Sequence, residues 1–347
     1  MKQQAIRFKA WNKTQLPKRV LIIRLQATGD MVLSLPFIES IREQLPKDAR
    51  IDFLVREEVE SIPKSLILFD NIYSIKGGRS SKKQLAYLLF MLPKLFINRY
   101  DAVLDLQNNK ISKIARTLLF PRCWVQFDRT SSNHATERYR RTLAASGFLE
   151  PELHYHYQFK NPLSGLNKLK DAGWNQEDKL ILINPAGAFE TRNWPLENYI
   201  AFCKLYLQQI DNNAKFLIMG LQSIAHKAEY LKASLGDHLI NLVGQTTPAE
   251  VFNIVQKLNF TLSEDGAIMH MSYLSKIPTI CMIGSVRKDW TDPCLPHTFC
   301  FHSDDLPCGN CMQATCALGN NLCMIRVLPE MAIEKTKSLL GTSKLRT

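Results

Sequence analysis

The chain has 347 residues, of which 46% are hydrophobic, and its formal net charge is +12. This length favours two domains, because single domains usually hold about 100–200 residues. The longest apolar stretch, Leu85 to Ile97, contains Pro93 and Lys94 and is shorter than the roughly 20 residues of a membrane span. The beginning of the chain is polar and basic, unlike a secretory signal. We therefore expect a cytoplasmic protein.

The excess of positive charge points to a polyanionic partner. Nucleic acid, an anionic membrane surface and a phosphorylated glycolipid all fit this charge. A solvated basic surface without a partner is the plainer interpretation. Nucleic acid ranks last of the three partners, because the sequence contains no recognisable RNA- or DNA-binding motif.

Strands alternate with helices in the first half of the chain. Val20 to Leu25 is typical of a buried strand, and it ends at the turn Thr28-Gly29-Asp30. Such alternation predicts a parallel sheet with helices on both faces. The other elements expected here are a helix at Met31 to Gln44, strands at Ile51 to Val55 and Ala102 to Leu106, and a helix at Ile111 to Leu119.

The stretch Leu85 to Ile97 has apolar residues at helical spacing and carries Lys82, Lys83, Lys94 and Arg99 around it. One interpretation is a helix that packs into the core. The other is a basic, apolar patch that touches the inner membrane leaflet. The sequence leaves both open.

The second half repeats the alternation after a candidate linker at Pro151 to Leu166. We expect helices at Leu196 to Gln209, Ala225 to Leu235, Pro248 to Lys257, Ala267 to Ser275 and Pro329 to Leu340. The expected strands are Leu180 to Asn184, Lys215 to Met219, His238 to Leu242, Phe260 to Leu262 and Thr279 to Ile283.

Three turns that follow strands carry the candidate chemistry, because ligands of open α/β sheets bind beyond the carboxyl ends of the strands. In the first turn, Asp30 stands at the mouth of a helix. It is either a helix N-cap or a general base.

The second turn follows the strand that ends at Asn184. Gly187 and Ala188 leave the backbone open to a ligand, and Arg192 can neutralise a diphosphate leaving group. The plainer interpretation of Arg192 is a surface side chain. We expect Trp194 to be a packing anchor.

The third turn reads Asp265-Gly266-Ala267 and leads into His270 one helical turn later. Small residues at a helix start leave N–H groups available to an anion, and Asp265 can bind hydroxyl groups. Taken alone, His270 fits a buried, hydrogen-bonded histidine equally well.

Near the end of the chain, four cysteines follow the pattern C-x2-C-x4-C-x6-C. The first pair has the spacing of zinc ligands, but the later gaps are irregular. A cytoplasmic location disfavours a disulfide. A structural role and a bound metal both remain open for this cluster, which comprises Cys308, Cys311, Cys316 and Cys323.

The chain resembles glycosyltransferase family 9, the lipopolysaccharide heptosyltransferases, over nearly its whole length. The resemblance lies in the segments RLQATGDMVLSLPFIESIR, NPAGAFETRNWPLENY, VGQTTPAEVFNIV, EDGAIMHMSYLSKIPTICMIG and CMIRVLPEMAIEK. It implies an α/β protein with the GT-B fold, in which two Rossmann-like domains face each other across a cleft. Residues 1–160 would bind the acceptor. Residues 161–347, with the cysteine-containing tail and the terminal helix, would bind the sugar nucleotide.

The resemblance also implies roles for individual residues. Asp30 matches the proposed catalytic base of the family, and Arg192 takes the position of the basic residue near the diphosphate. The donor-binding positions match Gly187, Ala188, Asp265, Gly266, Ala267 and His270. The family needs no catalytic metal or other cofactor.

Several positions depart from the pattern of the family. The family commonly has Lys in place of Arg192, a hydroxyl residue in place of Gly266, and an acidic residue at Gln222. Hydroxyl residues of the other turns are replaced by Ala27, Gly187 and Ala188. These departures concern the donor pocket and leave the identity of the sugar nucleotide open.

The resulting expectation is an inverting transfer of heptose from ADP-heptose to the anionic Kdo and heptose inner core of lipopolysaccharide, with peripheral contact to the inner membrane. The alternatives are a family 9 transferase for another nucleotide sugar and a non-catalytic glycolipid-binding protein with a GT-B fold. A metal-dependent nucleic-acid-binding protein is the least favoured alternative, so no nucleic acid is expected as a partner.

Overall fold

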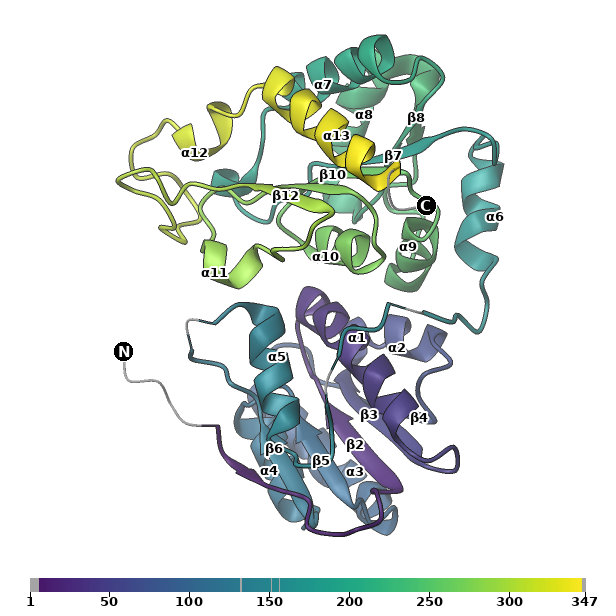
Figure 1. Cartoon of the computed structure of the whole chain (residues 1–347), viewed down its shortest axis with the longest axis vertical. Coiled ribbons are helices and arrows are strands. Elements are labelled where there is room, and N and C mark those ends of the chain that lie inside the picture. Colours follow the sequence, from purple (N-terminus) through teal and green to yellow (C-terminus); the bar gives the residue numbers. More distant parts are fainter. Residues whose placement is uncertain (1–5, 132, 151, 156, 345–347) are drawn as a thin grey trace. The chain divides into compact units, whose positions relative to one another are not determined.

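A computed structural model describes residues 6–131, 133–150, 152–155 and 157–344. The chain folds into two compact units, which comprise residues 1–161 and 162–347 (Figure 1). Each unit is a twisted sheet with helices on both faces. The alternating pattern predicted such sheets and the family resemblance implied two Rossmann-like domains, and this architecture is confirmed.

Unit 1 contains six strands among its described residues. They are β1 (Phe8–Lys9), β2 (Arg19–Ile23), β3 (Arg50–Arg56), β4 (Asn71–Ile75), β5 (Ala102–Asp105) and β6 (Cys123–Gln126). Its helices are α1 (Thr28–Gln44), α2 (Ser61–Ser65), α3 (Ser81–Ile97), α4 (Lys110–Leu118) and α5 (Ala135–Ala144), with a 3-10 turn at Glu57–Val59.

The strand order in unit 1 is β1-β6-β5-β2-β3-β4, and all neighbours except β1 and β6 run parallel. Helices α3 and α4 cover one face, where Leu88 and Leu95 pack against Leu21 and Val103. Helices α1 and α5 contact each other elsewhere in the unit. The chain leaves the sheet centre in opposite directions from β2 and β5, so the carboxyl ends of these two strands form the switch point at which such sheets bind ligands.

Unit 2 contains the strands β7 (Leu180–Asn184), β8 (Lys215–Ile218), β9 (Leu239–Asn241), β10 (Phe260–Glu264), β11 (Thr279–Met282) and β12 (Thr298–Phe301). Its helices are α6 (Ser164–Asp171), α7 (Leu196–Gln209), α8 (Ala225–Leu235), α9 (Pro248–Val255), α10 (Ala267–Leu274), α11 (Lys288–Thr291), α12 (Leu322–Ile325) and α13 (Pro329–Lys344). Single 3-10 turns lie at Glu190–Arg192, Gln222–Ile224 and Gly236–His238.

The sheet of unit 2 has the order β12-β11-β10-β7-β8-β9 and is parallel throughout. Side chains of α7, α8 and α13, among them Phe202, Leu231 and Ile333, pack in one cluster with Ile181 of β7 and Phe216 of β8. The switch point lies between β7 and β10. Two of the three candidate turns follow these two strands.

The linker expected at Pro151 to Leu166 ends earlier than predicted, because a helix begins at Ser164. Residues 151 and 156 lie outside the described residues, and the last three positions, Ser164 to Leu166, already belong to α6. Gly165 explains the early start of this helix. A Cβ atom there would lie 2.6 Å from the carbonyl oxygen of Glu250, so the small residue lets α6 pack closely on α9.

No helix in the described part of the chain is long and apolar enough to cross a membrane.

Candidate functional site

Asp30 lies in the first turn of α1, directly after the central strand β2 of unit 1. The helix begins at Thr28, three residues earlier than expected, so Ala27 rather than Asp30 holds the N-cap position. The backbone N–H of Ala27 donates to the Asp30 carboxylate at 3.4 Å. The carboxylate therefore helps to close the helix start, while its side chain remains 50% exposed and accessible to a substrate.

Arg24 holds the Asp30 carboxylate in place. The Arg24 side chain is buried, and one of its terminal nitrogens lies 2.5 Å from the Oδ2 of Asp30. The other terminal nitrogen donates to the carbonyl of Leu106, and the guanidinium lies over the rings of Phe127 and Tyr139. An arginine fixed on several sides orients the carboxylate more firmly than a solvated cation would.

The turn between β2 and α1 is tied to the neighbouring strand β5. The side-chain oxygen of Gln107 accepts hydrogen bonds from the backbone N–H groups of Leu25 and Gln26, both at 2.9 Å. The hydroxyl of Tyr139 donates to the backbone carbonyl of Asp30 at 2.7 Å. These bonds fix the Asp30 turn at the switch point of unit 1.

The same edge of the sheet carries a cavity of about 470 Å³. Three cationic side chains line it, Arg56, Arg79 and Lys110. Its remaining lining residues are Gln26, Ser81, Gln84, Asn109 and Ile111. We call it the Arg56 pocket. Because Gln26 contributes to its wall, the pocket adjoins the Asp30 turn.

In unit 2, the structure brings together Arg192 and Asp265, which follow the neighbouring strands β7 and β10. A terminal nitrogen of Arg192 lies 2.9 Å from the Oδ2 of Asp265, and both side chains are mostly buried. The guanidinium also lies over the ring of Phe189 at 4.7 Å. Among the described residues, its Nε has no hydrogen-bond partner. Arg192 is therefore an anchored, mostly buried cation at the carboxyl edge of the sheet, and the surface interpretation is wrong.

Glu264, the last residue of β10, organises the turn that leads to Arg192. It is fully buried, and its two carboxylate oxygens accept the backbone N–H groups of Gly187 at 2.6 Å and Trp194 at 2.7 Å. Burial raises its pKa to about 7, although the Gly187 N–H and the positive charge of Lys227 act in the opposite direction. Sequence reasoning missed this residue.

Gly187 has no room for a side chain. A Cβ atom there would lie 2.6 Å from the carbonyl oxygen of Arg192 and 2.9 Å from the Oε2 of Glu264. The neighbouring Ala188 is exposed in the same turn. Trp194 is buried, and its indole N–H donates to the carbonyl of Val327 at 2.8 Å, which confirms it as a packing anchor.

The turn after β10 places Gly266 and Ala267 at the start of α10. The N–H groups of a first helical turn have no partner within the helix and favour an anion. His270 lies one turn further on, where its Nδ1 contacts the Tyr273 hydroxyl at 2.5 Å. This contact fits the interpretation of His270 as a hydrogen-bonded histidine and leaves a ligand-binding role untested.

Gln222 follows β8, which is the other neighbour of β7 in the sheet. Its side chain is exposed and lies across Gly244, where an added Cβ atom would come within 2.1 Å of the amide oxygen. Gly244 has a φ of +73°, a conformation that favours glycine. Gln222 thus stands at the same carboxyl edge as Arg192.

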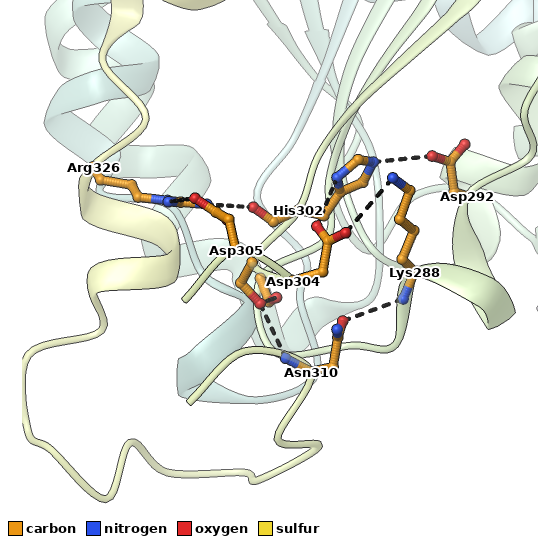
Figure 2. Close-up of polar contacts among 9 residues, drawn as sticks. Lys288, Asp292, His302, Asp304, Asp305, Asn310 and Arg326 are labelled. Atoms are coloured by element: carbon orange, nitrogen blue, oxygen red, sulfur yellow. Dashed lines mark hydrogen bonds and ion pairs between the residues drawn. The ribbon is translucent and has the colours of Figure 1, made fainter. Parts of the chain in front are cut away.

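The cysteine-containing tail is fastened to the edge of the sheet by charged residues (Figure 2). His302 lies between Asp292, at 3.0 Å from its Nε2, and Asp304, at 3.2 Å from its Nδ1. Arg326 donates to both oxygens of Asp305 and to the carbonyl of His302. This network supports a structural role for the tail.

All nine cysteines are free thiols, and those of the tail are exposed or half-buried. Burial, followed by the neighbouring thiols of Cys311 and Cys316, raises the pKa of Cys323. Within residues 6–344, apart from the gaps given above, no group of three or more His, Cys, Asp or Glu side chains is placed to hold a metal ion.

Two doubly wound sheets, each with a polar turn at its switch point, are the architecture of the GT-B fold. The sequence model of glycosyltransferase family 9 (heptosyltransferase) matches residues 92–322. The chain belongs to this family and is a glycosyltransferase.

Individual relatives are distant in sequence but match over almost their full length. The lipooligosaccharide heptosyltransferase 2 of Campylobacter jejuni is 24% identical over 334 residues, which cover 91% of this chain and 97% of the relative. A family 9 glycosyltransferase from Veillonella parvula has a TM-score of 0.77 at 17% identity, with 94% and 97% of the two chains covered. The E. coli heptosyltransferase WaaC with ADP-2-deoxy-2-fluoro heptose has a TM-score of 0.67 at 17% identity, with 92% and 99% covered.

Proposed function

We propose that the protein transfers heptose from ADP-heptose to the anionic Kdo or heptose inner core of lipopolysaccharide, with inversion at the anomeric carbon. The observation that carries this proposal is the Arg192–Asp265 pair at the switch point of unit 2. The names of the relatives support it, since one is a lipooligosaccharide heptosyltransferase and another binds an ADP-heptose analogue.

On the donor side, the leaving group is a nucleoside diphosphate, and its departure develops negative charge. Arg192 would stabilise this charge, because Asp265 holds its guanidinium in place at the switch point. N–H groups at the start of α10 would add to this effect. Asp265 and His270 are then placed to contact the sugar or the nucleotide. Gly187, Ala188, Gln222, Gly266 and Ala267 would form the rest of the donor site.

On the acceptor side, Asp30 would act as the general base. It would take the proton from the acceptor hydroxyl as that oxygen attacks the anomeric carbon on the face opposite the diphosphate. The C–O bond to the diphosphate breaks as the new glycosidic bond forms. The Arg56 pocket would bind the carboxylate or phosphate groups of the acceptor, because it presents three cations beside the Asp30 turn.

The proposed reaction uses no metal or organic cofactor, and ADP-heptose is a substrate. Since nucleotide sugars are cytoplasmic molecules and the acceptor is anchored in lipid, we also propose that the protein works in the cytoplasm and at the cytoplasmic face of the inner membrane.

Calorimetry with ADP-heptose, ADP, and UDP- and GDP-sugars tests the donor assignment. We expect ADP-selective binding that Arg192→Ala weakens by about tenfold or more, the loss expected for one charge-assisted contact. Preference for UDP or GDP would move the enzyme to another sugar, and an unchanged affinity in the variant would refute the role of Arg192. Transfer of heptose to a Kdo–lipid A acceptor, followed by mass spectrometry, then tests the reaction itself. The absence of turnover with any donor would favour a glycolipid-binding protein.

A further inference from the structure

Helix α3 turns an apolar face to the solvent. Leu88 and Leu95 of this helix are buried against the sheet, whereas Phe90 is 80% exposed and Ile97 is 75% exposed. A helix on the surface of a soluble domain normally presents polar residues on the side away from the core. We call this side the α3 outer face. Its exposed apolar residues are Ala86, Leu89, Phe90, Pro93, Phe96 and Ile97, and Lys94 is exposed beside them.

The apolar surface continues onto the end of α4. Phe120 is 75% exposed and lines, together with Phe96 and Leu119, a cavity of about 780 Å³. The φ of Phe120 is +47°, in the left-handed region that commonly ends a helix and that glycine occupies most easily. A bulky aromatic residue in this conformation is uncommon and points to a use for its exposed ring.

Positive charge surrounds this apolar surface. The same cavity is lined by Lys13, Lys18, Arg19, Arg99 and Arg122, against one carboxylate, Asp101. Lys82 and Lys83 lie at the N-terminal end of the α3 outer face. In the described part of the chain, no ion pair joins Lys82, Lys83 or Arg99 to a carboxylate. Aromatic and aliphatic side chains fringed by lysine and arginine are typical of helices that lie in the interface of an anionic bilayer.

We propose that the α3 outer face, together with Phe120, docks on a membrane surface rich in anionic phospholipid. The apolar side chains would enter the boundary between headgroups and acyl chains, while the surrounding cations contact the headgroups. A protein partner fits less well, because the cores of protein interfaces are depleted of lysine, and here lysines lie at both ends of the apolar face.

The position of α3 relates this surface to the Arg56 pocket. Ser81 and Gln84, in the first turn of α3, line that pocket, whereas Phe96 and Ile97 lie at the far end of the helix. A helix of 17 residues is about 25 Å long at about 1.5 Å per residue. Docking would therefore bring the pocket to within about one helix length of the bilayer, a span that a polar saccharide on a lipid anchor can bridge.

Flotation with lipid vesicles tests the proposal. The probe is vesicles of equal parts phosphatidylglycerol and phosphatidylethanolamine, compared with vesicles of phosphatidylcholine alone. The purified protein is expected to float with the anionic vesicles and to be released by high salt, because screening weakens the attraction of the basic fringe. The variant Phe90→Ser/Phe96→Ser/Ile97→Ser is expected to bind at least tenfold more weakly, since each apolar side chain contributes to insertion.

Two further variants sharpen the test. Ile67→Ser removes another exposed apolar residue of unit 1, outside the α3 outer face, and should bind vesicles like the unchanged protein. Phe120→Gly removes the ring but suits the positive φ, so it should weaken binding without lowering the melting temperature. An unchanged circular dichroism spectrum and an unchanged melting temperature of the triple variant would show that loss of flotation is not unfolding of unit 1.

The proposal fails if the unchanged protein does not float with anionic vesicles, or if the triple variant floats equally well. It also fails if the protein self-associates at increasing concentration and the triple variant does not, because a second copy would then cover the face. The proposal rests on the proposed function at the inner membrane and deepens it, but flotation tests docking without any substrate. Heptose transfer to a delipidated acceptor should be unchanged in the triple variant, so failure of the reaction and failure of docking are separate results.

Discussion

At the scale of residues, the proposed acceptor side of the molecule depends on one carboxylate and the arginine that orients it. Asp30 is half exposed and lies 2.5 Å from the buried Arg24. Its contact at the start of α1 is compatible with its proposed role as a base, because the backbone hydrogen bond is a long one of 3.4 Å. The arrangement predicts that removing the charge impairs catalysis far more than folding.

Asp30→Asn should lower kcat by about 10²–10⁴-fold, the usual contribution of a general base, while the affinity for ADP-heptose stays unchanged. Steady-state kinetics and calorimetry measure the two quantities. Asp48→Asn, which removes an exposed carboxylate of the same unit, is the matched control and should retain activity. Normal turnover by Asp30→Asn would exclude this residue as the base.

Glu264 gives a second prediction at this scale. Its pKa is about 7 in the folded chain and near 4.5 when exposed, so the neutral form is favoured by folding. The contribution of this group to stability is therefore full below pH 4.5 and is lost as the pH rises through about 7.

Glu264→Gln should remove this pH dependence. Because an amide has only one acceptor oxygen, the variant leaves the N–H of Gly187 or Trp194 unpaired, which costs about 1–3 kcal/mol. Urea unfolding between pH 5 and 8 should show the variant less stable throughout, with a deficit that narrows toward higher pH. A deficit that widens with pH would contradict the raised pKa.

The sequence predicted the residues that stand in turns better than those that support them. Arg192, Asp265 and Gly187 follow strands, and the structure brings them to one edge of the sheet. Glu264 was missed because its partners are 70 and 77 residues away. Arg24 was missed although its partner Asp30 is in the next turn, because Arg24 stands inside the apolar run of a predicted strand. A charged residue within or at the end of a buried strand requires such a partner, and this signal was available.

At the scale of elements, a capping network joins α6 and α9. Thr247 caps α9 and exchanges hydrogen bonds with Glu250, which also accepts from Ser164 and Lys168 at 2.8 Å each. Burial acts to raise the pKa of Glu250, but Lys168 and the Thr247 N–H outweigh it and lower the pKa to about 2.

This lowered pKa means that the stabilising effect of Glu250 is present above its ordinary pKa of 4.5 and is lost as the pH falls toward about 2. Glu250→Gln should therefore destabilise unit 2 at neutral pH by about 1–3 kcal/mol, toward the lower end because Lys168 is partly exposed. Thermal unfolding at several pH values measures the effect. A deficit of equal size at pH 2 and at pH 7 would argue against an ionic contribution.

Most strands with a buried apolar run were predicted within a few residues, including short ones such as β9. Strands β4, β6 and β12 were missed because each buries only one or two residues, so no buried apolar run marks them. Helix α5 is mostly polar and buries only Tyr139, Thr142 and Leu143. For α3, the interpretation as a core helix is confirmed for the face that carries Leu88 and Leu95, whereas contact of this helix with a membrane stays a prediction.

At the scale of the whole molecule, the chain consists of two units, each with its own sheet and switch point. The candidate donor residues all belong to unit 2, in the turns after β7, β8 and β10. A nucleotide that binds only there adds its binding free energy to the stability of that unit, about 2.7 kcal/mol at a hundredfold excess over Kd. This binding free energy stabilises unit 1 only if the two units unfold in one cooperative transition.

Hydrogen exchange with and without ADP therefore separates the roles of the two units. We expect slower exchange at residues 185–194 and 264–270, and little change in the Asp30 turn, because ADP lacks the acceptor. Arg192→Ala should need more ADP for the same protection, whereas Asp30→Asn should behave like the unchanged protein. Protection confined to unit 1 would reverse the assignment of donor and acceptor to the two sheets. Protection in neither unit would indicate another nucleotide or an obligatory acceptor.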